Sequence, residues 1–414
     1  MHLRLWAIVY MWVIGFNSGV GTNLVLRPYY LVAGISWIDI IIIIAGLRLL
    51  LIRRGIFLSR SHATLGLGTV FLAFWLMLCT ALNAWRFETM MVDFLPMLKL
   101  LYLIILATLV ADLVSRHGVR HLILGASVGV FLVAFQDMFM STANVNGIPL
   151  LTNPNVTGAL LGQGAAFAVF YMVFTGSRVQ GFIIALLMTA LSVTSFSKGA
   201  WLMCACACLA AGAVSVDAQQ ETSISRARRA LTALILLTLI GVAAQVVLKN
   251  QEVLGAILDL KIETSVDGGS VSSRFGFVMA AVYAALENPL FGLGYRNFYH
   301  TQWLYPQLQL PSLERGDNAH NVFAETLATG GFPAALLLVL VFAAPFMPLW
   351  RLLGLHMTRM LWRAVVWLML LAVWTLYGAV QLQLVAQPTF WLMAGMVFGM
   401  NALGCKSVRR QSDL

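Results

Sequence analysis

The chain has 414 residues, of which 60% are hydrophobic and only 10% are charged, and its mean hydropathy is +0.87. This composition excludes a water-soluble globular protein, because too little polar surface exists to cover a chain of this length. The formal net charge of +10 comes from basic residues in short clusters between apolar runs. Such clusters are typical of membrane topology and not of a nucleic-acid-binding stripe, so no nucleic-acid partner is expected.

Apolar runs long enough to cross a bilayer recur from one end of the chain to the other. They predict an all-α polytopic membrane protein of about twelve transmembrane helices, which we interpret as one integral membrane domain over residues 1–414. The predicted spans lie near residues 4–20, 31–52, 64–83, 93–114, 121–140, 156–176, 179–195, 199–216, 230–249, 321–350, 360–381 and 388–405.

Arginine and lysine cluster in the connections that follow every second span. Because cytoplasmic connections are enriched in these residues, both termini are predicted to be cytoplasmic. A long loop over residues 251–319 then lies outside, which is the periplasm in a bacterium with two membranes. We therefore expect a multi-pass protein of the inner membrane. The basic connections contain Arg53, Arg54, Arg60, Arg116, Arg120, Arg178, Arg226, Arg228, Arg229, Arg351, Arg359, Lys406, Arg409 and Arg410.

The loop over residues 251–319 carries signals of its own helix. Ser272 and Ser273 can cap a helix, and Asn288-Pro289 can end it. This pattern predicts an interfacial amphipathic helix over about 273–287, lying along the membrane surface. Apolar residues recur in it at helical spacing: Phe275, Val278, Met279, Val282 and Leu286. The loop also holds cations on a face where they are otherwise scarce: Lys261, Arg274, Arg296 and Arg315.

Two basic residues outside the cytoplasmic clusters are suited to binding an anion. Arg274 is expected in the first turn of the surface helix, where free backbone N–H groups and the helix dipole attract phosphate. Lys198 follows Ser197 in a tight external connection that suits close approach of an oxyanion. Two alternatives stay open, namely lipid headgroup binding by Arg274 and a Lys198 side chain that extends to the interface.

His320 begins the tenth predicted span, at the boundary between external water and hydrocarbon. A histidine there can be neutral and accept a proton from a hydroxyl group, although a hydrogen bond at the start of a helix explains it equally well. Glu325, one turn deeper, needs a partner, and both orientation of His320 and pairing with a cation are open. Asn155 follows Pro154 at the start of the sixth span and can cap that helix.

The sequence lacks the patterns that hold metals and nucleotides. Its acidic residues are not spaced as a cation cage, and no glycine-rich loop with a lysine occurs. Neither a metal nor a cofactor is therefore expected. A cluster of cations would then be the natural means of holding a diphosphate leaving group.

Several motifs in this order resemble the O-antigen ligase and polymerase superfamily of bacterial membrane glycosyltransferases. The resemblance covers roughly residues 153–331, together with the many-helix topology. The motifs are Asn153-Pro154-Asn155, Phe196-Ser197-Lys198-Gly199-Ala200-Trp201, Ser273-Arg274, Asn288-Pro289-Leu290-Phe291-Gly292-Leu293-Gly294, Asn297-Phe298, and His320-Asn321 with Gly331.

The resemblance implies a lipid-dependent (GT-C-like) glycosyltransferase that moves a glycan from undecaprenyl diphosphate to a sugar of the lipid A core. The transfer would occur on the periplasmic side of the membrane, without metal and with inversion. Membrane lipids would surround the protein. Carried onto matching positions, His320 would activate the acceptor hydroxyl, and the donor diphosphate would contact Arg274, Lys198 and Arg296. Supporting roles fall to Asn321, Glu325, Asn155 and Ser197.

Other functions share parts of this pattern. A polymerase that joins repeat units on the same carrier lipid, or a protein O-oligosaccharyltransferase, would use the same motifs with a different acceptor. A membrane transporter would use broken helices and charges near the middle of the bilayer, and Pro154 and Asp137 are compatible with it. No paired internal repeat supports the transporter. On the motifs, we expect an O-antigen ligase.

Overall fold

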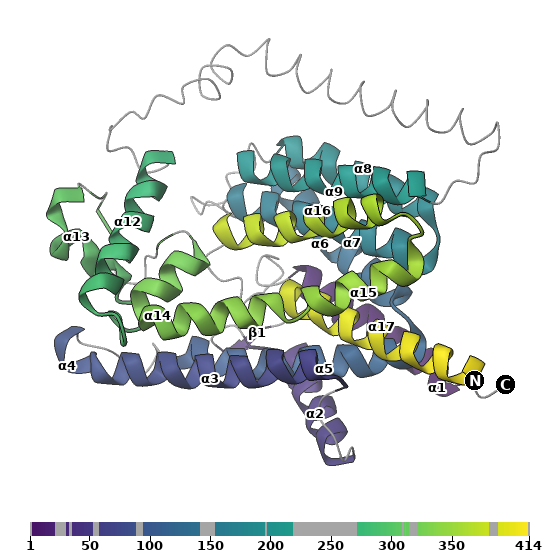
Figure 1. Cartoon of the computed structure of the whole chain (residues 1–414), viewed down its shortest axis with the longest axis horizontal. Coiled ribbons are helices and arrows are strands. Elements are labelled where there is room, and N and C mark those ends of the chain that lie inside the picture. The colour runs from purple at the N-terminus through teal and green to yellow at the C-terminus, as the bar shows by residue number, and fades with distance from the viewer. Residues whose placement is uncertain are drawn as a thin grey trace, which may run out of the picture.

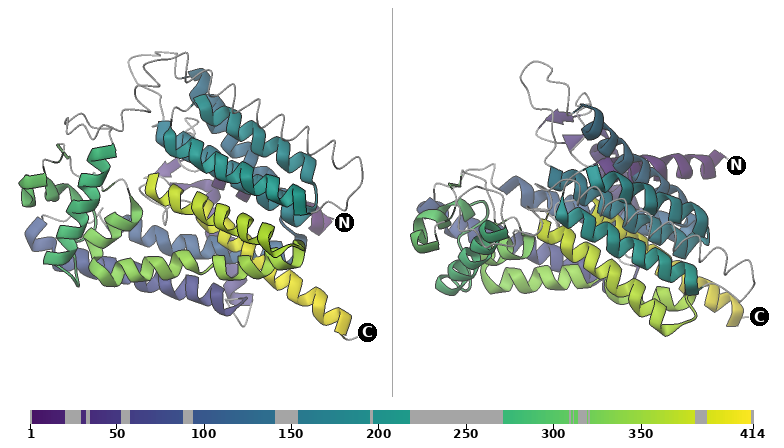
Figure 2. Two further views of the ribbon diagram at one scale, coloured as in Figure 1. Left: turned by 45° about the horizontal axis from the view of Figure 1, so that its top comes forward. Right: turned by 90° about the horizontal axis from the view of Figure 1, so that it is seen from above.

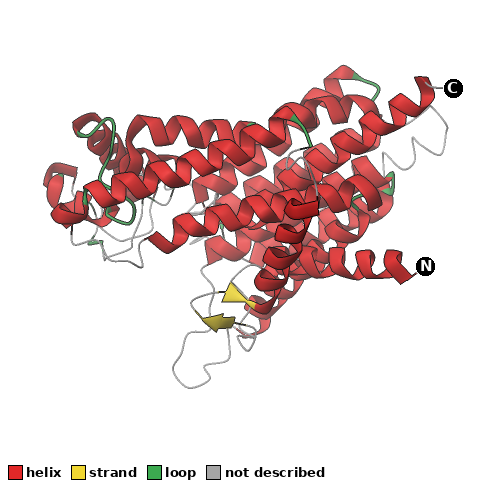
Figure 3. Ribbon diagram, turned by 90° about the horizontal axis from the view of Figure 1, so that it is seen from below, coloured by secondary structure: helices red, strands yellow, loops and turns green. Residues whose placement is uncertain are grey.

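The computed structural model describes residues 2–20, 30–32, 35–52, 58–87, 94–140, 154–194, 197–217, 271–308, 310, 312–313, 319, 321–380 and 388–412. The described chain is helical apart from one short pair of strands (Figures 1 and 3). The predicted all-α polytopic membrane architecture is confirmed.

The long helices follow the apolar runs. They are α1 (His2–Val20), α2 (Trp37–Ile52), α3 (Arg60–Leu82), α5 (Leu95–His117), α6 (Arg120–Met140), α7 (Pro154–Thr175), α8 (Arg178–Thr194), α9 (Lys198–Asp217), α12 (Val271–Glu287), α14 (Val322–Ala343), α15 (Phe346–His356), α16 (Met360–Val380) and α17 (Pro388–Ser412). Short helices are α4 (Ala84–Phe87), η3 (Phe298–His300), α13 (Thr301–Leu304) and η4 (Pro306–Leu308).

Each predicted span falls on a helix except 230–249, which lies outside the described residues. The tenth span is divided between α14 and α15. In the described part of the chain, six helical segments are long and apolar enough to cross a membrane. They are Arg60–Leu82, Met97–His117, Thr157–Thr175, Gly199–Asp217, Val322–His356 and Met360–Gly378. The sequence did not predict the antiparallel strands β1 (Tyr30–Val32) and β2 (Ile35–Ser36), which are too short to carry a period-two pattern.

Close helix packing in the bundle depends on glycines spaced four residues apart. Gly15 and Gly19 of α1 face α6 so closely that a Cβ atom at either would lie 2.2 Å from a backbone oxygen of α6. Gly395 and Gly399 of α17 meet α5 in the same way, with a Cβ atom 2.6 Å from backbone oxygens. Small residues at this spacing let helix backbones approach, which is how helices associate in a membrane.

The two ends of the bundle differ. Both termini and the connection between α15 and α16 lie at one end, and α4, α12 and α13 lie at the other (Figures 1 and 2). In Figure 1, α12 runs across the direction of α3 and α14, so a membrane crossed by those two helices would have α12 in its plane.

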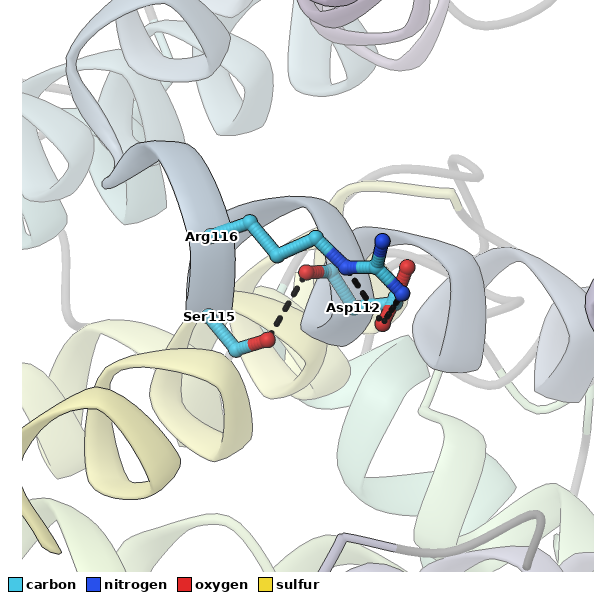
Figure 4. A network of polar contacts seen from close by, with 3 residues as sticks. All are labelled: Asp112, Ser115 and Arg116. Atoms are coloured by element: carbon cyan, nitrogen blue, oxygen red, sulfur yellow. Dashed lines mark hydrogen bonds and ion pairs between the residues drawn. The ribbon is translucent and has the colours of Figure 1, made fainter. Parts of the chain in front are cut away.

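Polar contacts at the end with the termini tie the helices together. At the end of α9, the Asp217 carboxylate accepts the backbone N–H groups of Thr358 and Arg359, each at 2.8 Å, and so caps the start of α16. In α5, the Arg116 guanidinium pairs with the buried Asp112 carboxylate at 3.1 Å, and the Ser115 hydroxyl donates to the Asp112 carbonyl at 2.8 Å (Figure 4). A buried carboxylate is thereby neutralised by its own helix.

Candidate active site

The sequence-predicted site residues lie in three segments. Lys198 is the first residue of α9, and Arg274 is in the first turn of α12, where the sequence placed it. His320 lies outside the described residues, as do the side chains of Lys198, Arg274 and Asn155. Arg315 also lies outside them. The convergence of these groups therefore stays a prediction, and the described residues around them define the frame that holds them.

The central element of that frame is a break in α14. Gly331 has φ 68° and ψ −168°, a backbone conformation that essentially only glycine adopts, and Pro333 follows it inside the helix. Proline has no N–H to donate, so the Thr329 carbonyl loses its normal partner four residues later. The break therefore exposes carbonyl groups of α14 in the middle of a membrane-length helix, and they need other donors.

The turn after α12, residues 288–294, supplies those donors. We call this segment the 288–294 turn. Its backbone N–H groups bind the freed carbonyls of α14, and its Pro289 carbonyl accepts a free N–H of α14. The bonds run from Leu293 N to Ala328 O, from Gly294 N to Thr329 O, and from Phe332 N to Pro289 O, each 2.9 Å long. The motif after α12 and the Gly331 motif thus form one interlocked unit.

Two glycines make this contact possible. A Cβ atom at Gly292 would lie 2.4 Å from the Ala328 carbonyl oxygen, and one at Gly331 would lie 2.4 Å from the Pro289 carbonyl oxygen. Both glycines also have positive φ angles, 55° and 68°. Any side chain at either position would separate the 288–294 turn from α14.

The end of α3 completes the frame with three polar side chains. The Trp75 indole donates to the Gly330 carbonyl at 2.9 Å, so the third freed carbonyl of α14 also has a donor. The Thr80 hydroxyl accepts the N–H of Tyr295 at 3.0 Å. The Asn83 amide donates to the carbonyls of Cys79 and Gly292, at 2.9 and 3.4 Å. Sequence reasoning missed all three, although polar residues within and just after an apolar span were a signal.

The residues on both sides of His320 are held in place. Asn321 is the N-cap of α14, and its side-chain oxygen accepts the N–H groups of Phe323 and Ala324, at 2.9 and 3.2 Å. The buried Glu325 carboxylate accepts the N–H of Ala319 at 2.8 Å. The Glu325 carboxylate thus holds the chain at Ala319, next to His320, and the two roles left open for it, orientation of His320 and pairing with a cation, stay predictions.

Arg296 lies on the turn that follows Gly294. It is the one non-glycine residue with positive φ in the described chain, at 62°. Its neighbour Asn297 is buried, and the Asn297 amide donates to the Leu293 carbonyl at 2.9 Å. Backbone strain of this kind costs on the order of 1–3 kcal/mol and persists where the surroundings impose it, often at functional sites. Arg296 is thus rigidly attached to the frame.

The α12 helix packs on the frame through its small residues. Ala280, Ala281 and Ala284 are buried against α14, in a cluster that includes Ala324 and Ala328. Phe277 is buried in the same cluster, whereas Phe275 is 66% and Leu286 is 62% exposed. An exposed apolar face on a helix that runs across the bundle is typical of a helix at a membrane surface. That placement of α12 stays a prediction.

A hydrogen bond joins the end of α12 to α13. The Tyr305 hydroxyl donates to the Glu287 carboxylate at 2.9 Å. Burial, and then this hydrogen bond with Glu287, raise the pKa of Tyr305 above its ordinary value. The hydroxyl therefore stays protonated and remains a donor, which fixes the irregular segment after the 288–294 turn.

The start of α9 is capped by Ser197. Its hydroxyl oxygen accepts the N–H of Ala200 at 3.4 Å, which places Lys198 at the first helical position. The Trp201 indole donates to the Ser192 carbonyl at 2.9 Å and holds the turn between α8 and α9 closed. The described role of Ser197 is thus to cap the helix. A grouping of histidine, cysteine or acidic residues able to hold a metal does not occur among the described residues.

The fold and the frame define a class: a helical membrane protein in which the irregular segment after α12 is locked onto a broken helix of membrane-spanning length. Residues 164–339 match the family described as O-antigen ligase. The matched segment contains every candidate site residue except Asn155. The match supports a membrane enzyme of the glycosyltransferase type in O-antigen processing. A search of the curated proteins found no match.

Replacement of Gly331 by alanine tests the interlocked unit. Alanine at this position is strained by the positive φ and collides with the Pro289 carbonyl, so the substitution is expected to destabilise the protein by about 1–3 kcal/mol and to abolish activity. Thermal unfolding in detergent measures the loss. Gly212, inside α9, where a Cβ atom meets nothing within 4 Å, is the control, and Gly212→Ala should not lower stability, because alanine is the better helix former. Equal stability of the two variants would show that the break in α14 needs no glycine.

Proposed function

We propose that this protein is an O-antigen ligase, which transfers a glycan from undecaprenyl diphosphate to a sugar of the lipid A core. The observation that carries the proposal is the family match over residues 164–339, the segment that holds the cations and the histidine motif. The interlocked 288–294 turn and α14 support it, because they fix the segment that follows α12 to α14, the helix that begins after the His320-Asn321 motif.

The proposed reaction is a direct displacement. His320 removes the proton from the acceptor hydroxyl, whose oxygen attacks the anomeric carbon of the donor sugar. The bond between that carbon and the diphosphate oxygen breaks, and the electron pair leaves with the diphosphate. The proton remains on His320, and the configuration at the anomeric carbon inverts, because the proposal includes no carboxylate nucleophile.

Three cations stabilise the leaving diphosphate in this proposal. Arg274 acts from the first turn of α12, where unpaired backbone N–H groups add to the positive potential. Arg296 acts from its strained turn, and Lys198 from the start of α9. Lys198 stands where the superfamily usually has arginine, so its contact is that of a point charge and not a bidentate one.

The proposed topology places this site on the periplasmic side of the inner membrane. The positions of the termini at one end of the bundle and of α12 at the other support it (Figure 1). We further propose that residues 1–414 form one membrane domain, into which residues 251–319 are inserted as the periplasmic loop. The reaction needs no metal in this account, because the cations supply the charge that a metal would.

Substitution of Glu325 separates two roles for its carboxylate. Glutamine keeps an oxygen that can accept the Ala319 N–H, whereas alanine leaves that buried group without its partner. If Glu325 holds the chain beside His320, Glu325→Gln should retain most activity and Glu325→Ala should lose about 5- to 150-fold in kcat, as expected when about 1–3 kcal/mol of positioning is lost. Equal loss in both variants would mean that the negative charge is what matters.

A deletion strain tests the proposed function. Loss of a ligase should leave bare lipid A core and long polymer accumulated on the carrier lipid. Loss of a polymerase would instead give core capped with single repeat units, and loss of a protein-specific enzyme would leave lipopolysaccharide normal. Either of the last two outcomes would overturn the ligase assignment.

A further inference from the structure

A groove with a volume of about 440 Å³ opens between the end of α3, α4 and the 288–294 turn. Its walls combine apolar side chains, among them Leu82, Trp85, Leu290 and Phe291, with the guanidinium of Arg86 and the two amides of Asn83 and Asn288. The volume lies within the range of about 300–1,000 Å³ typical of small-molecule sites. None of the residues proposed for catalysis lines the groove, so it is a separate feature of the same end of the protein.

The groove lies at the depth where hydrocarbon meets headgroups. α3 has 23 residues and is one of the candidate membrane spans. At about 1.5 Å per residue it is about 34 Å long, enough to cross a hydrocarbon layer of about 30 Å. Arg86 follows the end of α3 by four residues, so its guanidinium would reach the level of lipid phosphates.

The exposed side chains of the groove are of the kinds expected at the boundary between hydrocarbon and headgroups. Trp85 is 86% exposed and Leu290 is 57% exposed, which is unfavourable in water and favourable against lipid. Arg86 is also exposed, and within the described residues it makes no ion pair; its guanidinium lies 4.9 Å from the centre of the Phe87 ring. A cation beside an apolar wall is complementary to an anion that carries a hydrocarbon chain.

We propose that this groove binds an anionic phospholipid, with its phosphate at Arg86 and an acyl chain along Leu82, Trp85 and Leu290. A single cation matches the single charge of a phosphodiester, whereas a diphosphate calls for several. The Asn288 amide is placed to donate to headgroup oxygens. Because the groove also includes Gly292 of the interlocked unit, a bound lipid braces the 288–294 turn against the end of α3.

Native mass spectrometry of the full-length protein tests the proposal. The protein is released from detergent in the presence of phosphatidylglycerol, phosphatidylethanolamine or undecaprenyl phosphate. We expect phosphatidylglycerol to be retained in preference to the other two. Arg86→Gln should lower its retention about fivefold, which corresponds to about 1 kcal/mol for one basic residue at a membrane surface.

Two further variants make the test specific. Leu290→Asp places a carboxylate in the groove and should reduce phosphatidylglycerol retention at least as much as Arg86→Gln. Arg120→Gln removes an exposed arginine at the start of α6 and should leave retention unchanged. Equal retention of the two phospholipids, unchanged retention in Arg86→Gln, or preferential retention of undecaprenyl phosphate would each overturn the proposal. These outcomes are independent of whether the protein is a ligase.

Discussion

His320→Ala is expected to lower the rate of glycan transfer by about 100- to 10,000-fold, the usual contribution of a general base. The loss should appear in kcat, because the proposed role of the imidazole is to take the acceptor proton in the transition state. Expression and thermal stability should be unchanged, since α14 keeps its Asn321 cap and the Glu325 contact with Ala319. The measurement is transfer of glycan to lipid A core by purified protein.

A second histidine provides the control for this result. His117 is exposed in the last turn of α5, at the end of the bundle that carries the termini. His117→Ala should retain the activity of the unmodified protein. Unchanged activity in His320→Ala would remove the imidazole from the mechanism and leave the cations to explain catalysis alone.

Arg274→Ala is expected to lower kcat/KM by about 100- to 1,000-fold, the effect of removing one donor that stabilises developing negative charge. Arg274→Lys should recover only part of this loss, because an ammonium group cannot form the two parallel hydrogen bonds of a guanidinium. Kinetics of the three proteins with carrier-linked glycan as donor give the comparison.

The control for Arg274 is Arg351, an exposed arginine of α15. Arg351→Ala should leave transfer unchanged, because it removes the same charge from a helix outside the proposed site. An Arg274→Ala variant as active as Arg351→Ala would mean that the start of α12 does not contact the diphosphate. In that case the alternative left open by the sequence, lipid headgroup binding by Arg274, would be favoured.

The helices were predictable because a membrane-length apolar run can adopt few other structures. Every carbonyl and N–H in hydrocarbon must be paired, and a helix pairs them within one segment. The end of α12 was predictable from Asn288-Pro289. Its start was predicted less well, because the helix begins at Val271 and the predicted capping residues Ser272 and Ser273 lie inside its first turn. Local signals of this kind need no knowledge of the neighbouring chain.

The frame of the site was not predictable, because it depends on contacts between residues far apart in sequence. No break in α14 was predicted from the sequence, although Gly331 and Pro333 within one apolar span were a signal, and nothing local indicated that the 288–294 turn would bind the freed carbonyls. The Trp75 donor lies 255 residues from its acceptor, Gly330. Pairing at that distance is decided by the packing of α3 on α14 and not by either sequence alone.

The face of α12 that packs on the protein could not be predicted from its apolar residues. The stripe that includes Phe275 and Leu286 predicts the helix, yet these two side chains are exposed, and the alanines pack on the protein together with Phe277. In water the larger apolar side chains would be buried. At a membrane they can face lipid, while small residues let the backbones approach, so periodicity alone does not identify the packed face.

In the proposed mechanism, three cations and one imidazole transfer a glycan from a lipid diphosphate. The most direct test of this mechanism is transfer by the purified protein, supplied with carrier-linked glycan and lipid A core, in the presence of a chelator. We expect a glycan joined to the core sugar, with inverted anomeric configuration and a rate that the chelator does not change. Transfer that stops with the chelator, or a product that keeps the donor configuration, would contradict it.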